Sequence, residues 1–187
     1  MTWLVAGVLM FLGMHSISIL GLRDGAVARL GEGPWKGLYS IVSLVAFVML
    51  VWGYGEARTE PTLVWAPPVW TRHLALTILI PAFPLLFAAY LPGRISRAVG
   101  HPMVLATILW AGAHLLANGM LHDLVLFGGF LVWGVVDFVS LRARPVRPIA
   151  RAPETAFNDV IAVLLGLGAY GAFIGGVHAW LFGVAPI

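Results

Sequence analysis

Histidines are the side chains of this chain best suited to metal chemistry, because its 187 residues include six histidines and no cysteine. Without thiols the chain has no disulfide, no thiolate haem ligand, no iron–sulfur cluster and no cysteine-containing zinc site. His15 and His114 lie deep inside apolar runs, where an ionisable side chain is costly and is a functional candidate. We expect the others at helix ends: His73 and His122 interfacial and solvated, and His101 at a helix start. His178 either faces inward with Gly171 and Gly175 or snorkels, and we favour the second.

Two imidazoles from different helices favour haem iron with His/His ligation, because helical bundles build cofactor sites in this way. Two histidines alone make a poor structural zinc site. Small and polar residues surround His114 on its helix face beside one large ring, which fits the edge of a flat macrocycle: Trp110, Ala111, Ala117 and Asn118. Arg23 is a candidate partner for haem propionates, or a simple membrane anchor.

An alternative is that each histidine only hydrogen-bonds across helices and stabilises the bundle by about 1 kcal/mol. Depth also matters. His15 lies to the cytoplasmic side of the middle of its span and His114 to the outer side, a mismatch of roughly 10 Å at the rise of an α-helix. Helix tilt would close this gap. Otherwise His178 or His73 is the next candidate partner for His114.

The elements that must position these histidines are membrane helices. The chain is 60% hydrophobic and only 10% charged, which excludes a soluble globular domain. We predict an all-α, polytopic transmembrane bundle, a single domain over 1–187, with the lipid bilayer as its main partner. The apolar runs predict about six helices, near residues 2–22, 36–54, 74–91, 101–118, 121–140 and 157–182.

The charge pattern predicts the orientation of these helices. The net charge is +3, but the basic residues are scattered over loops, which argues against a nucleic-acid partner. The positive-inside rule places the basic loops in the cytoplasm and both termini on the non-cytoplasmic side, periplasmic in a bacterial inner membrane. Nine Lys and Arg lie in three alternate loops: Arg23, Arg29, Lys36, Arg94, Arg97, Arg142, Arg144, Arg147 and Arg151.

Two further expectations concern packing. Asp137 closes an apolar run and is expected to pair with Arg94 or Arg97. The last helix carries small residues at a spacing that lets membrane helices approach closely: Gly168, Ala172 and Gly176 on one face, with Gly171 and Gly175 beside them.

The fourth apolar run also carries a resemblance. Residues 100–119 read GHPMVLATILWAGAHLLANG, and LFGGF at 126–130 continues through Trp133 and Asp137. Together with His15-Ser16 and Arg23 in the first span, this pattern resembles the NnrU family of bacterial membrane proteins over nearly the whole chain.

The resemblance implies a link to nitrogen-oxide metabolism in denitrifying bacteria. It also implies homology to the zeta-carotene isomerase of plants and cyanobacteria, a membrane enzyme with b-type haem. The two histidines thought to hold that iron match His15 and His114. The isomerase has a cysteine three residues before the second histidine, where this chain has Ala111, so a thiolate ligand is impossible here.

Three functions stay open at this point. The first is a haem b protein with redox or gas-ligand chemistry on NO or nitrite, served by an unidentified electron donor. The second is a haem-dependent cis–trans isomerase of a lipophilic polyene such as a carotenoid. The third is a haem-free assembly factor or transporter.

Overall fold

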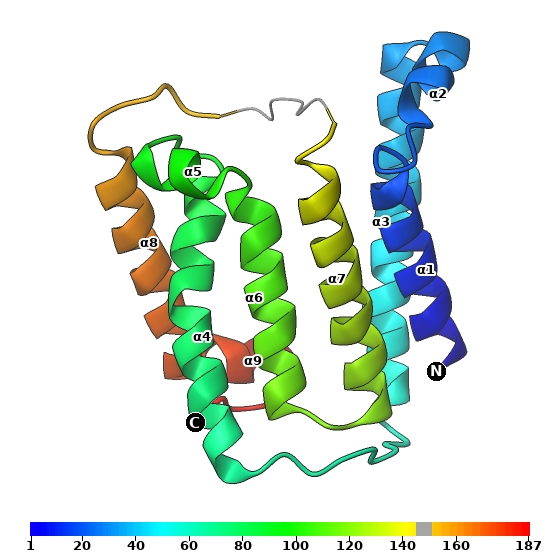
Figure 1. Ribbon diagram of the computed structural model, residues 1–187. Helices are drawn as coiled ribbons and strands as arrows, with labels where there is room; N and C mark the ends of the chain where they lie inside the picture. Colours follow the sequence, from blue (N-terminus) through cyan, green and yellow to red (C-terminus); the bar gives the residue numbers. More distant parts are fainter. Residues whose placement is uncertain (145–150) are drawn as a thin grey trace. The chain divides into compact units, whose positions relative to one another are not determined.

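The computed structural model describes residues 1–144 and 151–187, and they form helices joined by short connections (Figure 1). In this part of the chain the only β-type pairing is an isolated bridge between Leu63 and Met120, so the expected all-α class is confirmed. The chain divides into two compact units, residues 1–66 with 118–133 and residues 67–117 with 134–187. We describe each unit by itself.

The first unit contains α1 (Thr2–Ser16), α2 (Arg23–Leu30), α3 (Glu32–Ala57) and the first part of α7 (Leu121–Ser140). Helices α1 and α3 lie side by side (Figure 1) and touch backbone to backbone at two glycines. A Cβ atom on Gly7 would lie 2.5 Å from the Leu50 nitrogen, and one on Gly53 would overlap the backbone of Leu4. Small residues therefore set the distance between these helices.

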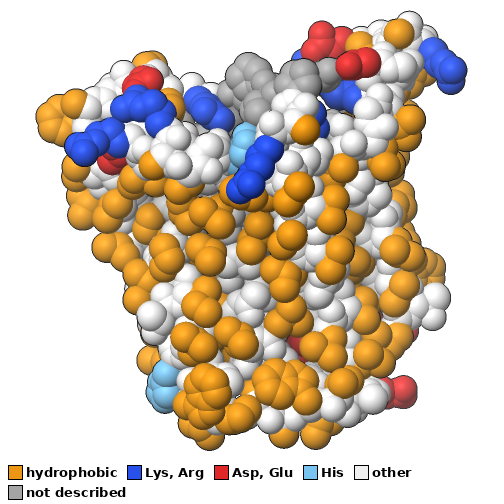
Figure 2. Space-filling model, in the orientation of Figure 1, with side chains coloured by type: hydrophobic (Ala, Val, Ile, Leu, Met, Phe, Trp, Pro, Cys, Tyr) orange, Lys and Arg blue, Asp and Glu red, His pale blue; other side chains and the backbone are white. Residues whose placement is uncertain are grey.

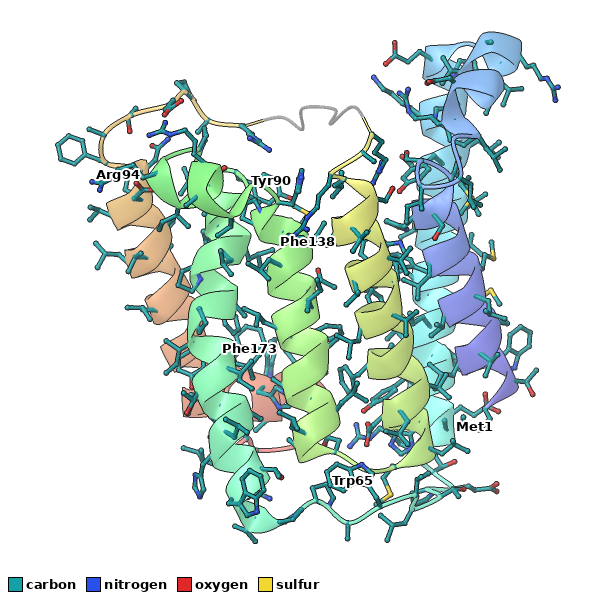
Figure 3. The ribbon with its side chains drawn as sticks, viewed as in Figure 1. Met1, Trp65, Tyr90, Arg94, Phe138 and Phe173 are labelled. Atoms are coloured by element: carbon teal, nitrogen blue, oxygen red, sulfur yellow. The ribbon has the colours of Figure 1, made fainter. Side chains whose placement is uncertain are left out.

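The second unit contains α4 (Val69–Ala88), α5 (Arg94–Val99), α6 (Pro102–Ala117), the rest of α7, α8 (Asn158–Ala172), the π-helix η1 (Phe173–Val177) and α9 (His178–Phe182). Helix α4 packs on both α6 and α8. Phe173 packs on Phe83 of α4, with ring centroids 5.3 Å apart (Figure 3).

The close contact of α8 differs from the expected one. A Cβ atom on Gly166 would overlap the backbone of Pro84 in α4, whereas one on Gly168, Gly171 or Gly175 would meet no described atom within 4 Å. The reason is the helix period: Asn158, Ala162 and Gly166 recur every four residues and form the buried face. The predicted stripe of small residues lies on other faces of α8.

Four helices of the described residues are long and apolar enough to cross a membrane: α3, α4, α7 and the run from α8 to α9. Helices α1 and α6 are apolar but shorter. Apolar side chains cover the helices, while Arg and Lys gather at helix ends (Figure 2). The chain is therefore an integral membrane protein, while the count of six spans stays a prediction. The sequence analysis missed the two short helices α2 and α5.

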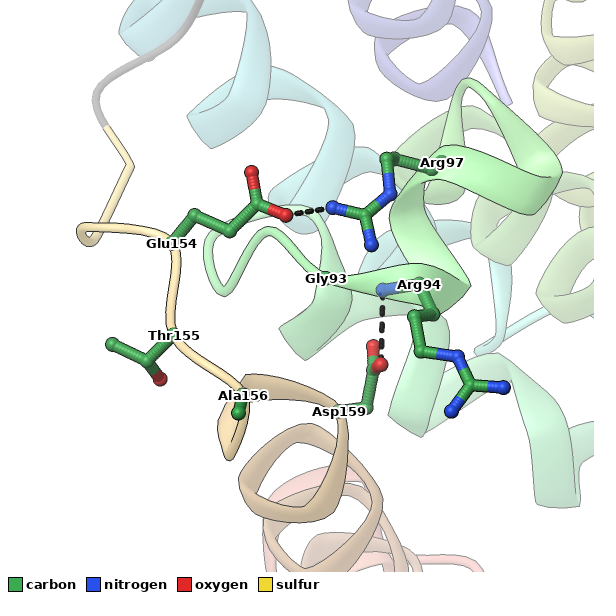
Figure 4. A pocket seen from close by; sticks show the side chains of 7 residues that line it. All are labelled: Gly93, Arg94, Arg97, Glu154, Thr155, Ala156 and Asp159. Atoms are coloured by element: carbon green, nitrogen blue, oxygen red, sulfur yellow. Dashed lines mark hydrogen bonds and ion pairs between the residues drawn. The ribbon is translucent and has the colours of Figure 1, made fainter.

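The polar end of the second unit is held by ion pairs and caps (Figure 4). Asp159, at the start of α8, accepts hydrogen bonds from the backbone N–H groups of Arg94 and Ile95, at 2.9 and 3.0 Å. Arg97 pairs directly with Glu154, and both residues line a hollow of about 410 Å³.

The partner expected for Asp137 was wrong. The Asp137 carboxylate, buried near the end of α7, pairs with Arg144 rather than with Arg94 or Arg97. Arg144 lies in the turn that directly follows this helix, so it reaches Asp137 without crossing to another element. Arg147, also counted in this basic loop, lies outside the described residues.

Candidate histidine site

His15 stands among aromatic rings in the first unit. Its ring stacks on Phe11 at 4.2 Å between centroids, and Tyr39 of α3 lies 5.6 Å away. Trp133 of α7 meets the imidazole edge-on at 6.1 Å. The indole N–H of Trp133 is buried and has no hydrogen-bond partner among the described residues. A buried donor without an acceptor is costly, so the Trp133 N–H beside His15 still needs a hydrogen-bond acceptor.

His114 belongs to the second unit and lies in the last turn of α6. Its Nδ1 atom is 2.8 Å from the carbonyl oxygen of Trp110, one turn earlier, and the Trp110 ring lies 5.3 Å away. The ring of His178 in α9 also lies near His114, with centroids 6.4 Å apart and 24° between the ring planes. His178 therefore lies beside His114, and its snorkelling at the membrane surface stays a prediction.

The three histidines share one feature that bears on metal binding. In each, Nδ1 lies at hydrogen-bond distance from a backbone carbonyl: His15 to Phe11 at 2.7 Å, His114 to Trp110 at 2.8 Å, His178 to Val184 at 2.7 Å. A carbonyl oxygen only accepts, so Nδ1 must carry the hydrogen. In the neutral ring Nε2 then holds the lone pair, and metal-binding histidines are oriented by this kind of second hydrogen bond.

The other predicted site residues take different positions. Ala111 is fully buried, and Asn118 follows the end of α6 and is half-buried. Arg23, at the start of α2, lies 3.7 Å from the Asp24 carboxylate and 4.0 Å from Glu32. A propionate at Arg23 would therefore compete with these two carboxylates. Since His15 and Arg23 belong to the first unit and His114 to the second, the His15–His114 pairing stays a prediction.

His122 was placed wrongly by the sequence analysis. It is not solvated: 5% of its surface is exposed, and Asp123 beside it is 4% exposed. Tyr54 of α3 donates a hydrogen bond to the Asp123 carboxylate at 2.6 Å, and its ring lies edge-on to His122 at 5.3 Å. A network that links α3 to α7 therefore buries both side chains. His73, by contrast, is exposed as expected.

The donor set limits which metal group fits. The described residues hold no cluster of three or more histidines and carboxylates that would enclose a bare ion. A porphyrin supplies four nitrogen ligands of its own and needs only axial ligands from the protein, and imidazole is a common one. Isolated or paired imidazoles with a prepared Nε2 therefore fit haem better than a structural zinc ion.

Comparison with known proteins agrees with the resemblance in the sequence. The chain matches the family described as NnrU protein over residues 3–186. No curated protein and no solved structure matches it. The family match spans almost the entire chain, from the start of α1 to the segment that follows α9. The chain therefore belongs to the NnrU family.

Proposed function

We propose that this chain is a haem b protein of the bacterial inner membrane, with His15 and His114 as the axial ligands of the iron. The observation that carries the proposal is the hydrogen bond from each Nδ1 to the carbonyl oxygen four residues earlier. This bond fixes the tautomer and places the lone pair of the neutral ring on Nε2, the nitrogen that would bind iron. The haem would supply redox or gas-ligand chemistry, which we assign to nitrogen oxides because of the family to which the chain belongs.

The surroundings of His15 and His114 support this assignment. Phe11, Tyr39 and Trp133 provide aromatic surface around His15, and Trp110 does so beside His114. The buried Trp133 N–H offers a hydrogen-bond donor to a group that arrives with an acceptor. Axial ligation and nearby donors are the features by which a protein sets the affinity of haem for gases and its reduction potential.

The first experiment is to express the chain with haem supplied, purify it in detergent, and measure its haem content and absorption spectrum. We expect close to one haem per chain with a low-spin Soret band. His114→Ala should change the band or lower the haem content, and His15→Ala should lower the haem content. His73→Ala is the matched control, because His73 is exposed on α4. A chain without haem, or a spectrum that neither substitution alters, would remove the proposal.

The nitrogen-oxide chemistry has its own test. NO added to the reduced protein should shift the Soret band, since an axial imidazole that leaves opens the iron to the gas. A spectrum unchanged by NO would leave electron transfer as the role of the haem. Turnover of a cis-carotenoid by the reduced protein would instead support the isomerase.

The proposed orientation has the basic loops in the cytoplasm and both termini in the periplasm. Because the chain has no cysteine, single cysteines report topology without background. A membrane-impermeant thiol reagent added to intact spheroplasts should label Glu60→Cys, in the second loop, and spare Gly25→Cys in α2. The reverse pattern would invert the orientation.

A further inference from the structure

The rings of His114 and His178 lie at a distance that two histidines holding one metal ion would also show. An imidazole that binds a metal at about 2.0 Å through nitrogen has its ring centroid about 3.2 Å from the ion. Two imidazoles on opposite sides of one ion therefore have centroids about 6.4 Å apart, and two in a tetrahedral site about 5.2 Å apart. The observed separation is 6.4 Å. Two imidazoles that hold one iron would show a similar centroid separation, and the planes of these two rings differ by 24°.

The position of His178 is built by features that a regular helix would not contain. The π-helix Phe173–Val177 directly precedes it and includes Gly176 at φ 144°, a conformation that favours glycine. One turn after His178, Gly183 adopts the left-handed conformation and turns the chain back. The Val184 carbonyl then lies 2.7 Å from His178 Nδ1. Single π-turns inside α-helices occur often at functional sites.

The chain thus offers three imidazoles with the same Nδ1 hydrogen bond, whereas a haem iron has two axial positions. We propose that His178 is a third iron-binding histidine, which takes the position opposite His114 and competes there with His15. In the exchange the bond between the iron and Nε2 of His15 breaks and the bond to Nε2 of His178 forms, without transfer of electrons. This inference rests on the haem binding proposed above. It adds a second histidine that can replace His15 as a ligand of the iron.

The test is electron paramagnetic resonance and absorption of the ferric protein in four forms: wild type, His15→Ala, His178→Ala and His15→Ala/His178→Ala. We expect both single variants to keep a low-spin, two-imidazole signal. The double variant should lose it and become high-spin. His15→Ala/His73→Ala is the matched double control and should stay low-spin, because His73 is exposed and carries no role in the proposal.

The outcomes separate the two proposals. A wild-type protein that binds no haem overturns both. A haem protein in which His15→Ala alone is already fully high-spin overturns the role of His178 and leaves the haem assignment intact. If the double alanine variant fails to fold, His15→Ala/His178→Met decides the question. A thioether opposite His114 should raise the reduction potential above that of His15→Ala, and an unchanged potential would contradict the proposal.

Discussion

His15 and His178 reach their positions by different means. His15 sits on α1, which is locked to α3 where Gly7 and Gly53 bring the two backbones into contact. His178 follows a π-helix, and its ring is held by a hydrogen bond to the Val184 carbonyl in the turn that comes after α9. The placement of His15 therefore depends on the packing of a whole unit, whereas that of His178 depends on about ten residues of local backbone geometry.

This difference has a consequence for stability and for binding. A change that separates α1 from α3 should weaken the first unit and the contribution of His15 together. A change in the π-helix should move His178 with little effect on the packing of α4 with α6 and α8. The following predictions test this contrast, from the largest expected effect on stability to the smallest.

Gly53→Ala should destabilise the protein by about 3 kcal/mol, the upper end of the usual cost of overpacking. The new Cβ atom would overlap the backbone of Leu4, which cannot rotate away as a side chain does. Gly37→Ala in the same helix meets no described atom within 4 Å and should be neutral or stabilising. Unfolding in mixed micelles with increasing SDS measures both. Equal stability of the two variants would contradict the α1–α3 contact.

Tyr54→Phe should cost about 2 kcal/mol, because it removes a 2.6 Å hydrogen bond to the buried Asp123 carboxylate. Tyr170→Phe in the second unit is the matched comparison. Its hydroxyl donates to the Leu76 carbonyl, a neutral acceptor, so the loss should be about 1 kcal/mol or less. The same SDS titration compares the two variants, and a larger loss for Tyr170→Phe would reverse the expected order.

Gly176→Ala should change stability by less than about 1 kcal/mol, since the strain that alanine would meet at φ 144° is relieved when the segment becomes a regular α-helix. That change rotates His178 away from His114. Combined with His15→Ala, it should convert the ferric haem from low-spin to high-spin. Gly175→Ala is the control at the neighbouring glycine, whose φ is negative. A low-spin signal that survives in Gly176→Ala/His15→Ala would show that the π-helix does not place His178.

Much of the fold followed from hydropathy alone. The apolar runs coincide with helices because a membrane span must satisfy its backbone hydrogen bonds internally. The sequence also singled out His15 and His114, since an imidazole within an apolar run is unusual. Their pairing was a hypothesis of sequence and resemblance, and it remains a prediction.

The errors have a common physical origin, which is that hydropathy does not report tertiary contacts. His122 lies in a short polar turn, and nothing local indicates that Tyr54, far away in the chain, covers it. The π-helix that precedes His178 had only one local sign, the pair Gly175-Gly176, which was assigned to helix packing instead. Asp137 pairs with Arg144, which is only seven residues later in the chain. The expected pairing with α5 did not take this nearby arginine into account.

The central claim is that imidazoles of this chain bind haem iron. The most direct test measures the haem-to-protein ratio and the ferric electron paramagnetic resonance spectrum of the purified wild-type protein and of His114→Ala. The account predicts one low-spin haem per wild-type chain and loss of that signal in His114→Ala, with His73→Ala unchanged. A protein that purifies without haem, or a low-spin signal of full strength in His114→Ala, would contradict it.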